Sequence, residues 1–168
     1  MATFDLSTLV PTGKIKQVVG ANFLSGDVIN SSSSYADSGH FIDITPTSAT
    51  SIILIQCSFK LKTNNTGQIS TAINGPKFQV VRTIDPDGSP SATNLTNDNA
   101  GSINDIGNGS WQITYRSQSW RFSDRPNTTD PIEYKIQFLK GFTAGTNATY
   151  FASANEYFPS IVAWEVGV

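Results

Sequence analysis

The chain has 168 residues, of which 38% are hydrophobic and only 14% charged, and its formal net charge is −2. This length predicts one domain with a single buried core. With 11 basic and 13 acidic residues, the chain has no strong positive electrostatic field that would attract nucleic acid or an anionic membrane surface. No apolar run approaches the ~20 residues of a membrane-spanning helix, no signal peptide is recognisable at the start, and the single cysteine excludes an internal disulfide.

The polar composition favours strands and turns. Ser, Thr and Asn together account for 51 residues. Their short side chains compete for local backbone hydrogen bonds and so favour turns and pleated surfaces over helix interiors. Because no segment has apolar residues at helical spacing, the sequence predicts an all-β protein.

The chain begins with a short arm, residues 1–13, which precedes the predicted domain at residues 14–168. The arm contains isolated apolar residues without strand periodicity and ends at a Pro-Thr-Gly turn signal. It is interpreted either as a contact arm or as a frayed terminus. The apolar residues concerned are Phe4, Leu6, Leu9 and Val10.

Alternation of apolar and polar residues predicts strands through the rest of the chain. The clearest case is Ser51–Thr63, where Ile53, Cys57 and Phe59 belong to one dry face. The last strand is apolar on both faces, so a further protein surface is expected to cover it. With frequent turn signals between strands, these features predict a two-sheet antiparallel jelly-roll sandwich. The expected strands are Ile15–Val19, Phe41–Thr45, Ser51–Thr63, Phe78–Ile84, Trp111–Arg116, Trp120–Phe122, Ile132–Phe138, Tyr150–Ala154 and Ile161–Val168.

Two internal segments are predicted as loops, and a third as a bulged turn between two halves of a strand. The loops are the serine run Ser31–Ser34 and the long polar stretch Asp85–Gly109. The bulged turn is Tyr35–Gly39. The long loop, together with Trp120 and Arg121, forms a candidate exposed recognition surface, and its Asp85, Asp87 and Asp98 leave a cation site open as an alternative to a simple Pro-Asp-Gly turn.

The sequence offers few candidate catalytic residues. His40 is the only candidate general base, but Asp37, Ser38 and His40 within one turn cannot adopt a Ser/His/Asp arrangement. Cys57 lies on the inward face of the clearest strand, where a thiol behaves as a small hydrophobic group. No Asp or Glu pair suggests glycoside cleavage. We therefore expect no enzymatic activity, no cofactor and no metal.

Several strand segments resemble the jelly-roll module of tailed-bacteriophage virion proteins. The motif Tyr35-Ala36-Asp37-Ser38-Gly39, followed by Ile42-Asp43-Ile44-Thr45-Pro46 and Ser51-Ile52-Ile53-Leu54-Ile55, is similar to a Tyr-x-Asp-Thr-Gly turn, an Ile-Thr-Pro strand end and an apolar strand. The later segments that match are Trp111–Tyr115, Tyr134–Phe138 and Ile161–Val166. Ser38 in place of the usual Thr and the long 85–109 stretch depart from the pattern. This module occurs in tail fibres and head decoration proteins and has a tumour-necrosis-factor-like trimeric architecture.

The resemblance implies a homotrimeric virion protein, made in the host cytoplasm. Our first hypothesis is a capsid decoration (cement) protein whose arm lies across neighbouring subunits of the major capsid protein. The alternative is a short tail or head fibre that contacts tail components and binds a host receptor or surface glycan; the lack of a long shaft favours decoration. A soluble lectin-like or carbohydrate-processing protein is a third hypothesis. Ile161, Ala163 and Trp164 are expected at the trimer interface or in the core.

Overall fold

The computed structural model describes residues 13–22, 28–65, 77–95, 112–139, 148–152 and 160–167. These residues form ten strands, and the described ranges hold no helix that could cross a membrane. The arm, residues 1–12, lies outside the described residues. The strands are β1 (Ile15–Asn22), β2 (Val28–Asn30), β3 (Ala36–Ile44), β4 (Ile52–Asn65), β5 (Lys77–Ile84), β6 (Ser91–Asn94), β7 (Gln112–Asp124), β8 (Ile132–Leu139), β9 (Ala148–Ala152) and β10 (Ser160–Val166).

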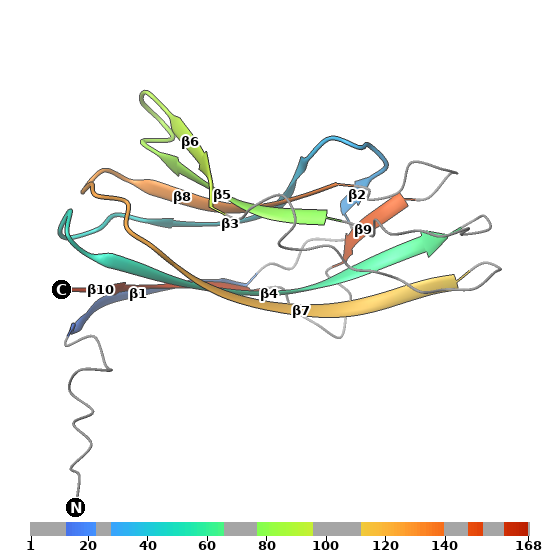
Figure 1. The fold of residues 1–168 in the computed structure, drawn as a ribbon, viewed down its shortest axis with the longest axis horizontal. Helices are drawn as coiled ribbons and strands as arrows, with labels where there is room; N and C mark the ends of the chain where they lie inside the picture. Colours follow the sequence, from blue (N-terminus) through green and yellow to red (C-terminus); the bar gives the residue numbers. More distant parts are fainter. Residues whose placement is uncertain are drawn as a thin grey trace, which may run out of the picture.

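The strands form two stacked antiparallel sheets (Figure 1). In sheet A, β4 pairs with β7 on one side and with both β10 and β9 on the other. Strand β1 pairs with β10, and β2 pairs with β9. Strands β10 and β9 therefore form one strand position in two pieces beside β4, and β1 and β2 form the next position in two pieces. Sheet B has the order β3-β8-β5-β6.

This order identifies a jelly roll. If the strand positions are numbered along the chain, with β1/β2 as the first and β9/β10 as the eighth, sheet A reads 1-8-3-6 and sheet B reads 2-7-4-5. Between successive positions, only the step from the fourth to the fifth, β5 to β6, stays within one sheet; every other step crosses to the opposite sheet. Double Greek-key connectivity of this kind defines the jelly roll. The predicted fold class is therefore confirmed.

The core lies between the sheets and follows the predicted strand phase. Ile53 and Phe59 of β4 and Tyr134 and Phe138 of β8 are fully buried. The ring of Phe78 on β5 packs edge-on against Phe59 at a centroid distance of 4.9 Å. Aromatic pairs in this geometry add to the hydrophobic gain of burial, so the two sheets are joined at their centre by interlocking rings.

Strand β3 contains the bulge expected at Tyr35–Gly39. Its register with β8 shifts between Asp37 and Phe41, and Gly39 has a φ of +76°. A glycine accepts this left-handed conformation without the steric cost of a Cβ. Between these pairs β3 advances four residues while β8 advances two, so β3 accommodates two extra residues. Two extra residues keep the alternation in phase, and Ser38 and His40 point inward like Ile42 and Ile44.

The structure contains two strands that were not predicted, β2 and β6. Two segments predicted as separate strands, Trp111–Arg116 and Trp120–Phe122, belong to the single strand β7. Strand β6 lies inside the stretch expected to be a loop; its four residues are polar or small and all exposed, so no alternation reveals them. Backbone pairing with β5 forms this edge strand. Strand β2 is only three residues long. Strand β7 runs unbroken across Ser117–Ser119 because β4 pairs with it along its full length.

Candidate functional site: an apolar sheet face

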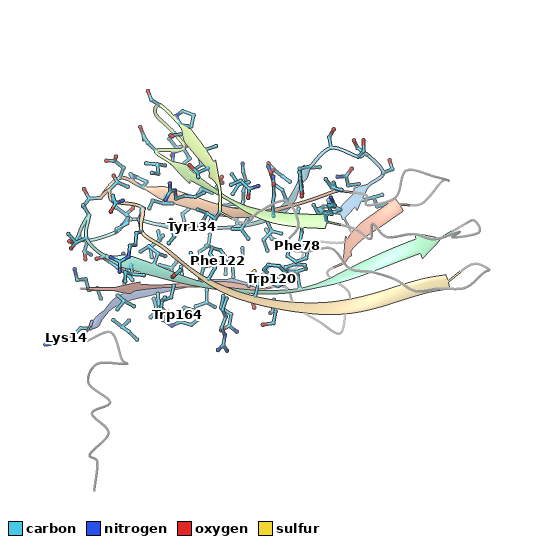
Figure 2. All side chains as sticks on the ribbon, viewed as in Figure 1. Lys14, Phe78, Trp120, Phe122, Tyr134 and Trp164 are labelled. Carbon is cyan, nitrogen blue, oxygen red and sulfur yellow. The ribbon has the colours of Figure 1, made fainter. Side chains whose placement is uncertain are left out.

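The outer face of sheet A carries a row of apolar side chains across three strands. Strand pairing places Val18 of β1 beside Trp164 of β10, and Trp164 beside Leu54 of β4. The inward positions on these strands are filled by core residues, so the alternation directs this row to the outside. Figure 2 shows Trp164 on the side of sheet A that faces away from Phe78, Trp120, Phe122 and Tyr134.

This row is exposed although it crosses the middle of a sheet. Val18 is 55% exposed and Leu54, on a central strand, is 42% exposed, while Trp164 is half-buried. Beside this row, the exposed Ile15 is paired with Val166, which is itself buried. Single exposed apolar residues are ordinary, but contiguous apolar surface on a folded protein marks a place where another surface binds.

Four of these apolar residues, Ile15, Leu54, Trp164 and Val166, form the floor of an open groove of about 650 Å³. Val18 is paired with Trp164 and lies next to this lining. At the β7 side the lining becomes polar, since it includes Arg121 and Gln56. Arg121 donates a hydrogen bond from Nε to Oε1 of Gln56 at 3.1 Å. The groove thus combines an apolar floor with one exposed cation at its margin. Its lining includes Ile15, Leu54, Gln56, Arg121, Trp164 and Val166.

A buried carboxylate beneath this face fixes the position of β1. Glu165 of β10 has no exposed surface and accepts hydrogen bonds from Gln17 (2.8 Å), the backbone and hydroxyl of Thr47 (both 2.8 Å) and the hydroxyl of Ser51 (2.6 Å). Burial raises the pKa of Glu165, but the hydrogen bonds from Ser51, Thr47 and Gln17 outweigh it and the net pKa is lowered. The ionised carboxylate therefore ties β1 and the β3–β4 connection to β10.

The outer face of sheet B has different chemistry. A ladder of hydrogen bonds crosses all four strands: Gln137 donates to Asp37, Gln79 donates to Gln137 at 2.7 Å, and Asn94 donates to Gln79 at 2.7 Å. Lys135 also lies 3.3 Å from Glu133 and 3.5 Å from Asp37. These polar groups find partners within the face itself, so they need no protein cover; Phe41 is the large apolar side chain exposed on the described part of this sheet.

A second polar cluster joins the two sheets internally. Arg82 of β5 lies 2.9 Å from the carboxylate of Asp124 on β7, and the hydroxyl of Tyr134 donates to the same carboxylate at 2.8 Å. Burial raises the pKa of Tyr134, and the charge of Asp124 raises it further. Asp124 is engaged by partners from β5 and β8, and its role is to hold the sheets together.

The candidate reactive residues are held in structural roles. The hydroxyl of Ser38 donates to the carbonyl of Ile136 at 2.7 Å and accepts from the backbone of His40, so it is not aligned as a nucleophile. Burial lowers the pKa of His40 to about 4 and raises that of Cys57 to about 12. Within the described ranges, no three His, Cys, Asp or Glu residues gather to hold a metal ion.

The residues expected at the trimer interface or in the core separate into two groups. Ile161 and Ala163 point inward and are buried, while Trp164 points outward. The expected arm residues Phe4, Leu6, Leu9 and Val10 lie outside the described residues. Their interface and anchoring roles remain predictions.

The expected recognition surface is not one surface in the structure. Asp85 and Asp87 lie in the β5–β6 turn, where the backbone of Gly88 donates to the carbonyl of Asp85 at 3.1 Å, and Asp98 lies outside the described residues. The exposed position predicted for Trp120 is wrong: this side chain faces inward, and its ring centroid is 4.6 Å from that of Phe78. The continuity of β7 sets this phase, so Arg121, the next residue, is exposed on the outer face of sheet A.

Val18 and Leu54 were not predicted from the sequence as part of the candidate site. One signal was present: Ile52 and Leu54 occupy the wet phase of a strand whose later outward residues are polar. Apolar residues at outward positions on two paired strands would have indicated the face. Their pairing, however, depends on register, which the sequence alone does not provide.

Comparison with known proteins finds similarity only at the level of solved structures. No protein-family model and no curated protein matches the chain. A structure of the infectious bursal disease virus Gx strain is 14% identical, with a TM-score of 0.39, covering 90% of this chain and 36% of that one. The VP2 subviral particle of infectious bursal disease virus is 12% identical, with a TM-score of 0.38, covering 90% and 38%. This chain therefore spans little more than a third of the length of those chains.

Proposed function

We propose that this chain is a non-enzymatic virion structural protein, a homotrimer that binds and stabilises a bacteriophage capsid shell as a decoration protein. The observation that carries the proposal is the exposed row Val18–Trp164–Leu54 in the middle of sheet A. The resemblance of the strand segments to the phage jelly-roll module supplies the virion context. The apolar face supplies a reason for the chain to assemble.

The apolar face provides the driving force for assembly. Fully burying an exposed Val or Leu side chain contributes about 1.5–3 kcal/mol. Val18 and Leu54 are about half exposed and would each gain part of this, and a trimer would bury the row three times. Obligate interfaces are typically this apolar and resemble a core. The polar ladder on sheet B is then the face left in water, and the arm is proposed to fasten each copy to its neighbours in the particle.

Two measurements test the proposal. Light scattering on the purified protein should give three times the chain mass. The trimers should then rebind to capsids stripped of this protein and raise the temperature at which those capsids release their contents. A stable monomer would overturn the homotrimer.

The fibre alternative has a different signature. Trimers that bind host cells, fail to rebind stripped capsids and localise to the tail in micrographs of particles would replace decoration with a receptor-binding fibre. A matched control for both assays is Leu54→Asp, which carries a charge on the apolar face and should show neither trimer nor capsid binding.

A further inference from the structure

The arm enters the described structure at the edge of the apolar groove. The backbone of Gly167 donates to the carbonyl of Lys14 at 3.0 Å, and the next residue, Ile15, lines the groove. Gly13 lies so close to Val166, another lining residue, that a Cβ at this position would stand 2.5 Å from its Cγ1. Figure 2 places Lys14 at the start of β1. The chain therefore leads directly from the arm into one wall of the groove.

A threefold assembly requires two different complementary surfaces. A patch that pairs with itself about a twofold axis gives a dimer, whereas a ring of three needs a donor surface on each copy and a different acceptor surface on the next. If the proposed trimer is correct, the groove on sheet A is an acceptor and needs a donor. The arm is an apolar segment of this same chain that begins at the groove.

The arm and the groove also match in size and charge. Twelve extended residues reach up to about 40 Å, so an arm can leave its own subunit. The groove spans sheet A from β1 to β7, three strand spacings or about 15 Å, and residues 4–10 can cover about 20 Å. Asp5 is the only charged side chain in the arm, and Arg121 is the exposed cation at the groove margin.

We propose that the segment from Phe4 to Val10 of one copy lies in the sheet A groove of a neighbouring copy. Its apolar side chains cover the row Val18–Trp164–Leu54, and Asp5 faces Arg121. Each copy gives one arm and receives one, which closes a ring of three. This inference rests on the proposed homotrimer and names the partner of its apolar face.

Directed cross-linking of the full chain tests the exchange. Two variants, Leu6→Cys and Leu54→Cys, are co-expressed with different tags and oxidised, and the product is analysed without reducing agent. We expect a covalent dimer that contains both tags. The native Cys57 does not interfere because it is buried and burial raises the pKa of its thiol to about 12. The matched control pairs Leu6→Cys with Phe41→Cys, which is as exposed as Leu54 but lies on sheet B, and should give no such dimer.

The outcomes separate this inference from the proposed function. No mixed dimer in a sample that light scattering shows to be trimeric overturns the arm exchange and leaves the trimer standing. A third variant carries both Leu6→Cys and Leu54→Cys in one chain. If the cross-link forms only within that chain, the arm exchange is also overturned, in favour of an arm folded onto its own subunit. A monomer without any cross-link overturns both.

A charge exchange provides a second test. Arg121→Glu should lower the yield of the mixed dimer about two- to fivefold, as expected for an exposed ion pair, and Asp5→Lys in the same chain should restore it. A yield unaffected by Arg121→Glu would contradict the placement of Asp5 beside Arg121.

Discussion

The outer faces of the two sheets occupy equivalent positions in one sandwich, yet their side chains differ in kind. On sheet B, Asp37, Gln137, Gln79 and Asn94 form a continuous hydrogen-bonded ladder across four strands. On sheet A, the equivalent crossing is the apolar row Val18–Trp164–Leu54. Both faces are built by the same alternation, so the fold did not determine the difference. A face whose polar groups bond to one another suits water, whereas contiguous apolar surface is typical of a place where another surface binds.

The largest expected effect comes from placing a charge on each face at matched exposure. Leu54 and Phe41 are 42% and 43% exposed, on sheets A and B respectively. Leu54→Asp would bury three unpaired carboxylates in each trimer, so we expect the dissociation constant to rise more than about 100-fold. Phe41→Asp should leave the trimer intact. Sedimentation at decreasing concentration measures both, and equal behaviour of the two variants would remove the proposed distinction between the faces.

Acid should weaken the fold that supports both faces. Burial lowers the pKa of His40 from 6.5 to about 4, so the unfolded chain binds a proton in this range while the folded chain does not. Stability therefore falls as the pH drops from about 6.5 to 4, by up to about 3 kcal/mol.

Glu165 acts at lower pH in the same direction. Because its folded pKa lies below the ordinary value of 4.5, its contribution is present above that value and is lost as the pH falls below it. Chemical denaturation across this pH range measures both effects. His40→Gln should flatten the dependence of the unfolding free energy on pH between 6.5 and 4 and keep the dependence below pH 4.5. If the dependence between pH 6.5 and 4 is unchanged, another group causes it.

Breaking the ladder on sheet B should affect stability and leave association unchanged. Gln137→Ala removes the middle of the ladder and leaves the side chains of Gln79 and Asp37 without that partner. We expect the free energy of unfolding to fall by about 1–2 kcal/mol, measured by urea denaturation. Loss of the trimer in this variant would show that sheet B also takes part in assembly.

The smallest effect is expected at Lys135. Its ion pairs with Glu133 and Asp37 are partly exposed, and such pairs contribute less than about 1 kcal/mol. Lys135→Gln should therefore change unfolding by less than Gln137→Ala. A larger loss would mean that charge pairing, more than the amide ladder, holds this face together.

Much of the fold could be predicted because alternation is a local signal. The inward residues of β4 and β8 were assigned from the sequence, since each strand buries one face completely. Strand β6 could not be found this way, because all of its residues are exposed and only pairing with β5 makes it a strand. The break expected before Trp120 was wrong because polar Ser117–Ser119 hide the continuity that β4 imposes.

The candidate site was only partly accessible from sequence. Trp164 was noticed because its strand is apolar on both faces, but the row needs the registers of β1, β10 and β4 together. These partners are far apart in the chain, and strand register is a tertiary property. The roles of Glu165 and Asp124 were missed for the same reason, since their partners come from distant strands.

The position of β10 has a consequence for the order of folding. This strand, close to the end of the described chain, is inserted between β1, which comes first, and β4, the longest strand. Sheet A therefore cannot close during synthesis until Ser160–Val166 has left the ribosome, and its pairings span large sequence separations, which makes folding slow. Until β10 arrives, β1 and the flank of β4 have unpaired edges, and the nascent chain is then most exposed to aggregation.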